Sequence, residues 1–286
     1  MLQREMTTVY LAPMNRILHL SLFCCAMVLF TCQEKDVNPE VITLSRGDIT
    51  LSVEPALGAR VSSLTFAGRE ILQTRRDSLG LQWGSTVWTS PQSDWNWPPI
   101  TTFDSELFAV SQLREGVILL ESQRDPDTFL RMRKRISLGN NNDVGLTYWV
   151  TNEGSSSVKV ALWENTRIPY GGYLTFRSDS IRYSLDSTLV DTRTSTQYIY
   201  LDDRHSKPQK LFADLREVPV SYHHDGLVLH KYTNVKQLYR TAPGQAPLEI
   251  YIDPVTGFAE FELQGDYQLI QPGESANLRV RWEVGE

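Results

Sequence analysis

Cysteine is scarce in this sequence, and its distribution limits the chemistry that the chain can perform. Only three cysteines occur in 286 residues, at positions 24, 25 and 32. The chain beyond Cys32 therefore offers no disulfide, no thiolate nucleophile and no thiolate metal ligand. A domain of this length is long enough to be stabilised by one large hydrophobic core instead.

Several signatures of enzymes and of nucleic-acid-binding proteins are also missing. The sequence has no glycine-rich phosphate loop, no nucleophile elbow and no spacing of His, Asp and Glu that is typical of a metal site. The formal net charge is −6, which argues against nucleic acid as a partner. The histidines beyond the N-terminal segment lie near turns, in a polar loop or on an alternating strand, and we interpret them as structural or solvated: His205, His223, His224 and His230. We therefore expect no metal, no cofactor and no nucleic-acid partner.

The N-terminal segment has the features of an export signal. Arg16 precedes an apolar run over residues 17–30. A basic residue followed by an apolar stretch of this length is typical of a signal peptide, and the stretch is too short to span a bilayer. We predict that residues 1–31 are a signal peptide. Met14 is a better start than Met1, because it places Arg16 at the head of a compact signal.

The end of this apolar run predicts how the protein is held after export. The segment 29–32, Leu-Phe-Thr-Cys, resembles a bacterial lipobox, in which the cysteine is lipidated and becomes the mature N-terminus. Residues 32–40 would then be the lipidated Cys32 and a polar tether. We expect an exported protein, anchored by lipid to the membrane of the bacterial cell envelope. The alternative is an ordinary cleaved signal with an incidental cysteine.

Residues 41–286 show the two-residue periodicity of β-strands. Apolar and polar residues alternate over 49–53, segments 130–136 and 144–150 are further predicted strands, and turn residues separate them. No segment sustains a 3.6-residue apolar period over three helical turns. Many short strands at regular spacing predict an all-β sandwich or barrel, which we expect to be a single domain.

Residues 83–99 contain four of the seven tryptophans of the chain. Three of them, Trp88, Trp95 and Trp97, alternate with Ser, Asn, Asp, Gln and Pro, so the segment predicts a loop stiffened by prolines. Flat aromatic faces flanked by short amide and carboxylate groups suit a sugar ring. The alternative is a structural loop whose indoles plug one end of a β-sandwich.

Three stretches, taken in their order along the chain, resemble the galactose-mutarotase-like superfamily. They are an opening hairpin over residues 54–70, a strand that ends in a Thr-Asn turn over 147–154, and a Glu-bearing strand with a following Pro-Gly-Glu turn over 257–275. The resemblance covers nearly all of residues 41–285 and implies the β-supersandwich fold of that family. Residues 88–95 resemble a bacterial lipoprotein branch of the superfamily.

The resemblance also implies roles for particular residues. In aldose 1-epimerases of this fold, a Glu takes the proton of the anomeric hydroxyl and a His protonates the ring oxygen. Glu262 matches the position of that base. On a strand Glu260, Glu262 and Gln264 share one face, which either lines a cleft or is solvated. The position of the His is occupied here by Trp163 or Glu164.

These patterns lead to one main hypothesis and two alternatives. We expect a carbohydrate-binding, mutarotase-like domain that lacks the standard acid–base machinery. The residues expected to bind the sugar are Trp88, Gln92, Asp94, Trp95, Trp97 and Arg167. The first alternative is an active aldose epimerase, or another sugar-active enzyme, with Glu262 as base and Glu164 as acid. The second is a structural domain of the cell envelope.

Overall fold

The computed structural model describes residues 40–74, 82–183, 190–233 and 240–286. All of them belong to the unit that begins at Asn38. The expected signal peptide, residues 1–31, and the expected lipidation site, Cys32, lie outside the described residues.

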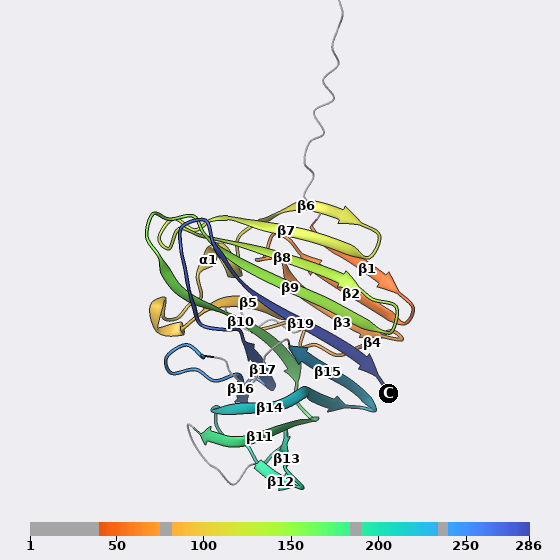
Figure 1. The fold of residues 1–286 in the computed structure, drawn as a ribbon. Helices are drawn as coiled ribbons and strands as arrows, with labels where there is room; N and C mark the ends of the chain where they lie inside the picture. Colours follow the sequence, from red (N-terminus) through yellow and green to blue (C-terminus); the bar gives the residue numbers. More distant parts are fainter. Residues whose placement is uncertain (1–39, 75–81, 184–189, 234–239) are drawn as a thin grey trace, which may run out of the picture. The chain divides into compact units, whose positions relative to one another are not determined.

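The described residues form strands joined by turns, with one α-turn and one 3-10 turn (Figure 1). The first half of the chain contributes β1 (Ile42–Arg46), β2 (Ile49–Glu54), β3 (Arg60–Phe66), β4 (Arg69–Glu70), β5 (Ser85–Ser90), η1 (Gln92–Asp94), α1 (Thr101–Asp104), β6 (Phe108–Arg114), β7 (Val117–Arg124), β8 (Leu130–Leu138) and β9 (Asp143–Asn152). The second half contributes β10 (Val158–Pro169), β11 (Tyr173–Tyr183), β12 (Val190–Arg193), β13 (Thr196–Tyr200), β14 (Gln209–His224), β15 (Leu227–Thr233), β16 (Leu248–Asp253), β17 (Phe258–Gln264), β18 (Gln268–Ile270) and β19 (Ser275–Gly285).

Strand β14 joins two arms of one antiparallel sheet. At its C-terminal end it pairs with β15, and the pairing continues through β19, β9, β8 and β7 to β6. At its N-terminal end it pairs with β16, and the pairing continues through β17, β10, β5, β3 and β2 to β1. The apolar residues of both arms form one hydrophobic cluster, so the arms are the two layers of a sandwich. This architecture confirms the predicted all-β fold.

The core follows from the alternation seen in the sequence. In β9 every second residue is buried, and the opposite residues are partly exposed. Because successive side chains of a strand point to opposite faces, one face of β9 packs into the core and the other faces outward. Each fully buried Val, Leu or Ile contributes roughly 1.5–3 kcal/mol through the hydrophobic effect.

Strand β5 differs from its sequence prediction. We expected residues 83–99 to form a loop, yet Ser85–Ser90 are a strand with all six residues buried. The strand lies inside the sheet between β3 and β10, so its Ser and Thr side chains are covered by neighbouring strands. Residues 91–99, which follow the strand and which we call the tryptophan loop, leave the sheet.

The turn before β3 packs closely against α1, which in turn contacts β5. Gly58 adopts a positive φ of 67°, and a Cβ on it would lie 2.4 Å from the carbonyl oxygen of Asp104. Only glycine allows the hairpin to approach α1 this closely. The approach places the buried Asp104 carboxylate 2.7 Å from both Arg60 and the indole nitrogen of Trp88.

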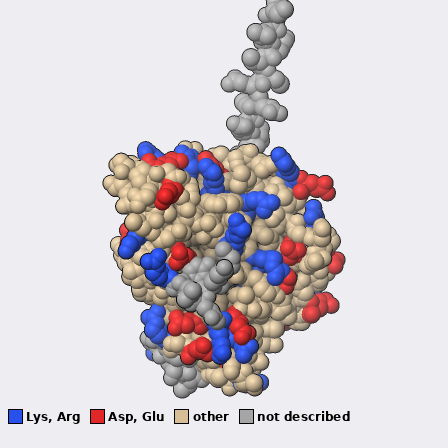
Figure 2. Space-filling view, in the orientation of Figure 1, with Lys and Arg blue, Asp and Glu red and all other residues tan. Residues whose placement is uncertain are grey.

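The visible surface carries both signs of charge interspersed (Figure 2). Ion pairs between partly exposed side chains include Arg131 with Glu153 and Arg133 with Glu121. Within the described ranges, no helix is long and apolar enough to cross a membrane.

Candidate functional site

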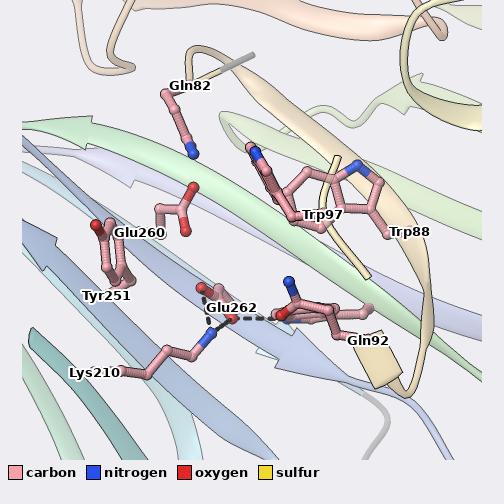
Figure 3. Close-up of a pocket in the computed structure, with 9 residues that line it drawn as sticks. Gln82, Trp88, Gln92, Trp97, Lys210, Tyr251, Glu260 and Glu262 are labelled. Carbon is pink, nitrogen blue, oxygen red and sulfur yellow. Dashed lines mark hydrogen bonds and ion pairs between the residues drawn. The ribbon is translucent and has the colours of Figure 1, made fainter. Parts of the chain in front are cut away.

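A cavity of about 310 Å³ opens where the tryptophan loop meets the sheet (Figure 3). Its walls combine indole rings with amide, carboxylate and ammonium groups: Gln82, Trp88, Gln92, Trp97, Trp163, Lys210, Tyr251, Glu260 and Glu262. The lining comes from strands β5, β10, β14, β16 and β17, from the tryptophan loop and, through Gln82, from the segment before β5. We call it the first cavity.

Cross-strand register creates the floor of the first cavity. Directly opposed residues of neighbouring strands share a face of the sheet. One row of opposed residues runs from Arg167 through Glu260 and Tyr251 to Lys210. A strip of polar side chains therefore crosses the sheet beneath the tryptophan loop.

The next row of the floor contains Glu262. It runs from Thr86 through Asn165 and Glu262 to Glu249, so these side chains share the face of the first row. All four residues are buried. Together the two rows bring Glu249, Glu260 and Glu262 to one face of the sheet, with Lys210 among them.

The Glu262 carboxylate is fully buried and is held by two different donors. The indole nitrogen of Trp163 donates a hydrogen bond to Oε2 at 2.8 Å. The ammonium of Lys210 donates to Oε2 at 2.9 Å and to Oε1 at 3.1 Å. Burial raises the pKa of Glu262 above its usual range, and the positive charge of Lys210 counteracts that rise.

Lys210 contacts the carboxylates of both Glu262 and Glu249. Its ammonium also lies 2.9 Å from the Glu249 carboxylate and 4.8 Å from the centre of the Trp163 ring. Burial lowers the pKa of Lys210, but the charges of Glu262 and Glu249 outweigh it, so the pKa lies above its usual value. Lys210 is therefore a charged donor at the wall of the cavity, with 22% of its side chain exposed.

Arg167 supports the cavity from beneath instead of lining it. Its guanidinium is fully buried, donates to Glu260 Oε1 at 2.7 Å and lies 4.8 Å from the centre of the Trp88 ring. Trp88 is fixed in turn by its hydrogen bond to Asp104. Arg167, which we expected to bind the sugar, therefore positions Glu260 and Trp88.

Glu164 lies on the opposite side of the sheet from Glu262. On β10 Trp163 lines the cavity and Arg167 lies on the same face of the strand, whereas Glu164 alternates to the core face. There its carboxylate lies 2.5 Å from Lys231, with both side chains fully buried. The structure does not bring Glu164 and Glu262 into one two-carboxylate site. Of the two candidates for the histidine position, Trp163 is the one that faces Glu262.

The tryptophan loop divides its residues between two cavities. Gln92 and Trp97 line the first cavity, and 44% of the Trp97 side chain is exposed. Asp94 and Trp95, which we also expected in the cleft, line a second cavity of about 210 Å³. Loop residues close in sequence thus serve different cavities.

Three lining residues had no signal in the sequence: Gln82, Lys210 and Tyr251. The latter two come from β14 and β16, and only the register of the β14–β16–β17 pairing brings them to Glu262. The shared face of Glu260 and Glu262 was predicted from alternation. Within the described ranges, no group of three or more His, Cys, Asp or Glu residues could hold a metal ion.

No protein-family model matches the sequence, and no curated protein matches it. Solved structures do resemble the described fold. A candidate aldose 1-epimerase from Escherichia coli K12 superposes with a TM-score of 0.65 at 14% identity, covering 86% of this chain and 98% of that one. A galactose mutarotase-like protein from Lactobacillus casei has a TM-score of 0.62 at 14% identity, over 86% of this chain and 100% of that one.

A third structure, a galactose mutarotase-like protein from Clostridium acetobutylicum, has a TM-score of 0.62 at 12% identity. It covers 86% of this chain and 95% of that one. Identities this low establish the fold alone. The resemblance found in the sequence is confirmed at that level: the chain has the galactose mutarotase-like β-sandwich fold.

Proposed function

We propose that the protein binds a sugar ring in the first cavity and is not an efficient aldose epimerase. The observation that carries this proposal is the lining itself. Indole faces of Trp97, Trp88 and Trp163 stand beside the side chains of Gln92 and Glu260. Indoles suit the C–H face of a sugar, and amides and carboxylates suit its hydroxyl groups. The cavity volume lies at the lower end of the ~300–1,000 Å³ typical of small-molecule sites, which favours a monosaccharide-sized ligand.

The contacts of Glu262 support binding over catalysis. A general base needs a free lone pair directed at the proton that it abstracts. Here Trp163 and Lys210 make three contacts with the two carboxylate oxygens. Trp163 also faces Glu262 where the resemblance implies a histidine, and an indole N–H is not a proton donor at neutral pH.

One observation favours residual enzyme activity as the alternative. The ammonium of Lys210 lines the cavity and contacts Glu262, so a cationic acid and a carboxylate base stand side by side. In this alternative Lys210, and not Glu164, would protonate the ring oxygen. The raised pKa of Lys210 makes it a weak acid, and for this reason we prefer the binding function.

Calorimetric titration of the purified protein with free monosaccharides tests the binding function. We expect at least one hexose or pentose to bind. Trp97→Ala should weaken this binding about tenfold, because an aromatic contact contributes roughly 0.5–1.5 kcal/mol beyond its area. Leu113→Ala is the matched control, because Leu113 is an exposed apolar residue on β6. If no monosaccharide binds, the proposal is wrong.

Optical rotation of freshly dissolved α-glucose and α-galactose separates binding from catalysis. We expect the protein to leave the spontaneous rate unchanged, because a missing acid partner removes about 10²–10⁴-fold in rate. Strong acceleration that disappears in both Glu262→Gln and Lys210→Met would establish the enzyme alternative.

We further propose that the protein is exported and anchored by lipid on Cys32. The support is the order of basic residue, apolar run and lipobox-like segment in residues 16–32. Cys32→Ser should release the protein from membranes or block its processing, whereas Cys25→Ser should fractionate like the wild type. Since one acyl chain binds a membrane only marginally, stable anchoring requires a second chain. Membrane association of a Cys32→Ser protein from which the signal peptide has been removed would refute the anchor.

A further inference from the structure

The second cavity lies against the other side of the tryptophan loop. Pro91, Asp94 and Trp95 contribute the wall from the loop, and Ser90 and Lys159 contribute polar groups from β5 and β10. Much of the remaining lining is aliphatic. The cavity therefore shares with the first one an indole, a carboxylate, a cation and a hydroxyl, and it differs in its more aliphatic floor.

Ser90 gives this cavity an unsatisfied polar atom. Only 2% of the residue is exposed, and its hydroxyl has no hydrogen-bond partner among the described residues. Buried hydroxyl groups in proteins are nearly always hydrogen-bonded. A buried, unpartnered hydroxyl at a cavity wall points to a ligand with hydrogen-bonding groups.

Trp95, which lines the second cavity, packs against two rings that line the first cavity. Its ring lies 5.9 Å from the ring of Trp88 and 6.4 Å from that of Trp163, measured between centroids, and both of those rings line the first cavity. The indole nitrogen of Trp95 donates to the carbonyl oxygen of Thr89 at 3.0 Å, which fixes the ring in place. Packed indole rings therefore separate the two cavities.

We propose that the second cavity is a second sugar subsite, so that the ligand is an oligosaccharide that crosses the tryptophan loop. This inference rests on the proposed function of the first cavity and extends it to a class of ligand. One sugar ring occupies the first cavity against Trp97. The adjoining ring occupies the second cavity, where the Ser90 hydroxyl, the Asp94 carboxylate and the Lys159 ammonium bind its hydroxyl groups.

The test compares sugars of increasing length on the purified full-length protein. The probes are glucose, galactose and their α-1,4- and β-1,4-linked di- and trisaccharides, titrated by calorimetry. We expect a disaccharide of one series to bind at least tenfold more tightly than its monosaccharide. Equal affinity for both lengths would overturn the second subsite and leave the first-cavity proposal intact. Failure of every sugar to bind would overturn both.

Two variants locate the gain in affinity. Ser90→Ala removes a hydroxyl that has no partner in the part of the chain that the structure describes, so it should leave the free energy of unfolding nearly unchanged and lower disaccharide affinity about three- to tenfold. The double variant Ser90→Ala, Lys159→Ala should abolish most of the gain while monosaccharide affinity stays the same. Gln92→Ala, on the first-cavity side of the same loop, should instead weaken mono- and disaccharide binding by the same factor. An undiminished gain in the double variant would refute the proposal.

Discussion

Two lysine–glutamate pairs differ in their access to solvent. Their glutamates, Glu164 on β10 and Glu262 on β17, point to opposite faces of the sheet, and their lysines come from β15 and β14. Glu164 and Lys231, which we call the sealed pair, are both fully buried in the core. Glu262 and Lys210, which we call the pocket pair, meet at the wall of the first cavity, where part of the Lys210 side chain is exposed. The same chemical interaction thus occurs once inside the core and once at an opening.

The contacts around the sealed pair explain its persistence in the core. Lys231 also donates to the hydroxyl of Thr166 at 3.0 Å and to the carbonyl of Phe261 at 2.8 Å. Glu164 accepts hydrogen bonds from the hydroxyls of Ser85 and Thr166. Burial lowers the pKa of Lys231, and the nearby Glu164 charge opposes that change. A buried pair tolerates desolvation only when its remaining donors and acceptors are satisfied in this way.

The comparison shows that solvent access determines what a buried ion pair can do. The side chains of the sealed pair are fully buried and line neither the first nor the second cavity, so we expect this pair to contribute to stability. The pocket pair has polar atoms at a surface that a ligand can reach. We therefore expect substitutions of the sealed pair to affect folding, and substitutions of the pocket pair to affect binding.

The largest effect should follow from removing the cation of the sealed pair. Lys231→Met leaves Glu164 buried without its partner, so the free energy of unfolding should fall by about 3–5 kcal/mol. Urea denaturation measures this loss. The double variant Lys231→Met, Glu164→Gln should recover most of it, because no unpaired charge then remains. A single variant as stable as the wild type would contradict the structural role of the pair.

Removing the cation of the pocket pair should have a smaller, pH-dependent effect on stability. Lys210→Met should cost about 1–3 kcal/mol at pH 7, because Glu262 and Glu249 lose their charged donor. The pKa of Glu262 is already raised by burial, and loss of Lys210 removes the group that counteracts this rise.

The sign of that pH dependence follows from proton binding. Above the ordinary glutamate pKa of 4.5, unfolded chains have released the proton that folded Glu262 retains. The stability of Lys210→Met should therefore decline, relative to the wild type, as the pH rises from about 5 through the raised pKa. Denaturation at pH 5.5, 7.0 and 8.5 checks the slope. A variant that gains stability relative to the wild type at high pH would refute this assignment.

Conservative changes of the two carboxylates should separate folding from binding. Glu262→Gln keeps the shape of the side chain and leaves Lys210 paired with Glu249, so stability should change by less than about 1 kcal/mol. Its sugar affinity should fall about tenfold. Glu164→Gln should show the reverse, with a loss of about 1–3 kcal/mol in stability and unchanged affinity. Titration calorimetry measures the sugar affinity of each variant, and urea denaturation measures its free energy of unfolding. Equal effects of the two variants on sugar affinity would contradict the assignment of binding to the pocket pair and of folding to the sealed pair.

The smallest effect should come from the hydrogen bond between Trp163 and Glu262. Trp163→Phe keeps an aromatic ring at the cavity and removes the donor, at a cost of about 0.5–1.5 kcal/mol in stability. Sugar affinity should change severalfold at most. The rate of mutarotation, followed by optical rotation, should stay at the spontaneous value, and a higher rate would show that Trp163 suppresses a latent base.

The sequence predicted the fold well because its strands alternate clearly. Segment 144–150 carries an apolar residue at every second position, and segment 130–136 does so except at Lys134, which is itself buried. Each segment is a strand with one buried face. Strand β5 escaped prediction because Ser85, Thr86, Thr89 and Ser90 are buried polar residues within the sheet, an arrangement that no alternation marks.

The site was predicted only in part, because local patterns do not report register. Trp88, Gln92, Trp97 and Glu262 were expected and do line the first cavity. Lys210 meets Glu262 only through the pairing of β14, β16 and β17, which the sequence does not specify. Glu164 follows Trp163 directly on β10, so its side chain points to the opposite face of the sheet from the first cavity.

The spacing of the indoles has a consequence for spectroscopy. The rings of Trp88, Trp95, Trp97 and Trp163 form a connected group whose neighbouring centroids lie 5.4–6.4 Å apart. Transition dipoles at such distances couple, so the group should produce an exciton couplet in circular dichroism and transfer excitation among its members. A ligand in the first cavity contacts Trp97, and one in the second contacts Trp95. The protein therefore carries its own optical reporter, and occupancy of either cavity should change its emission without any added label.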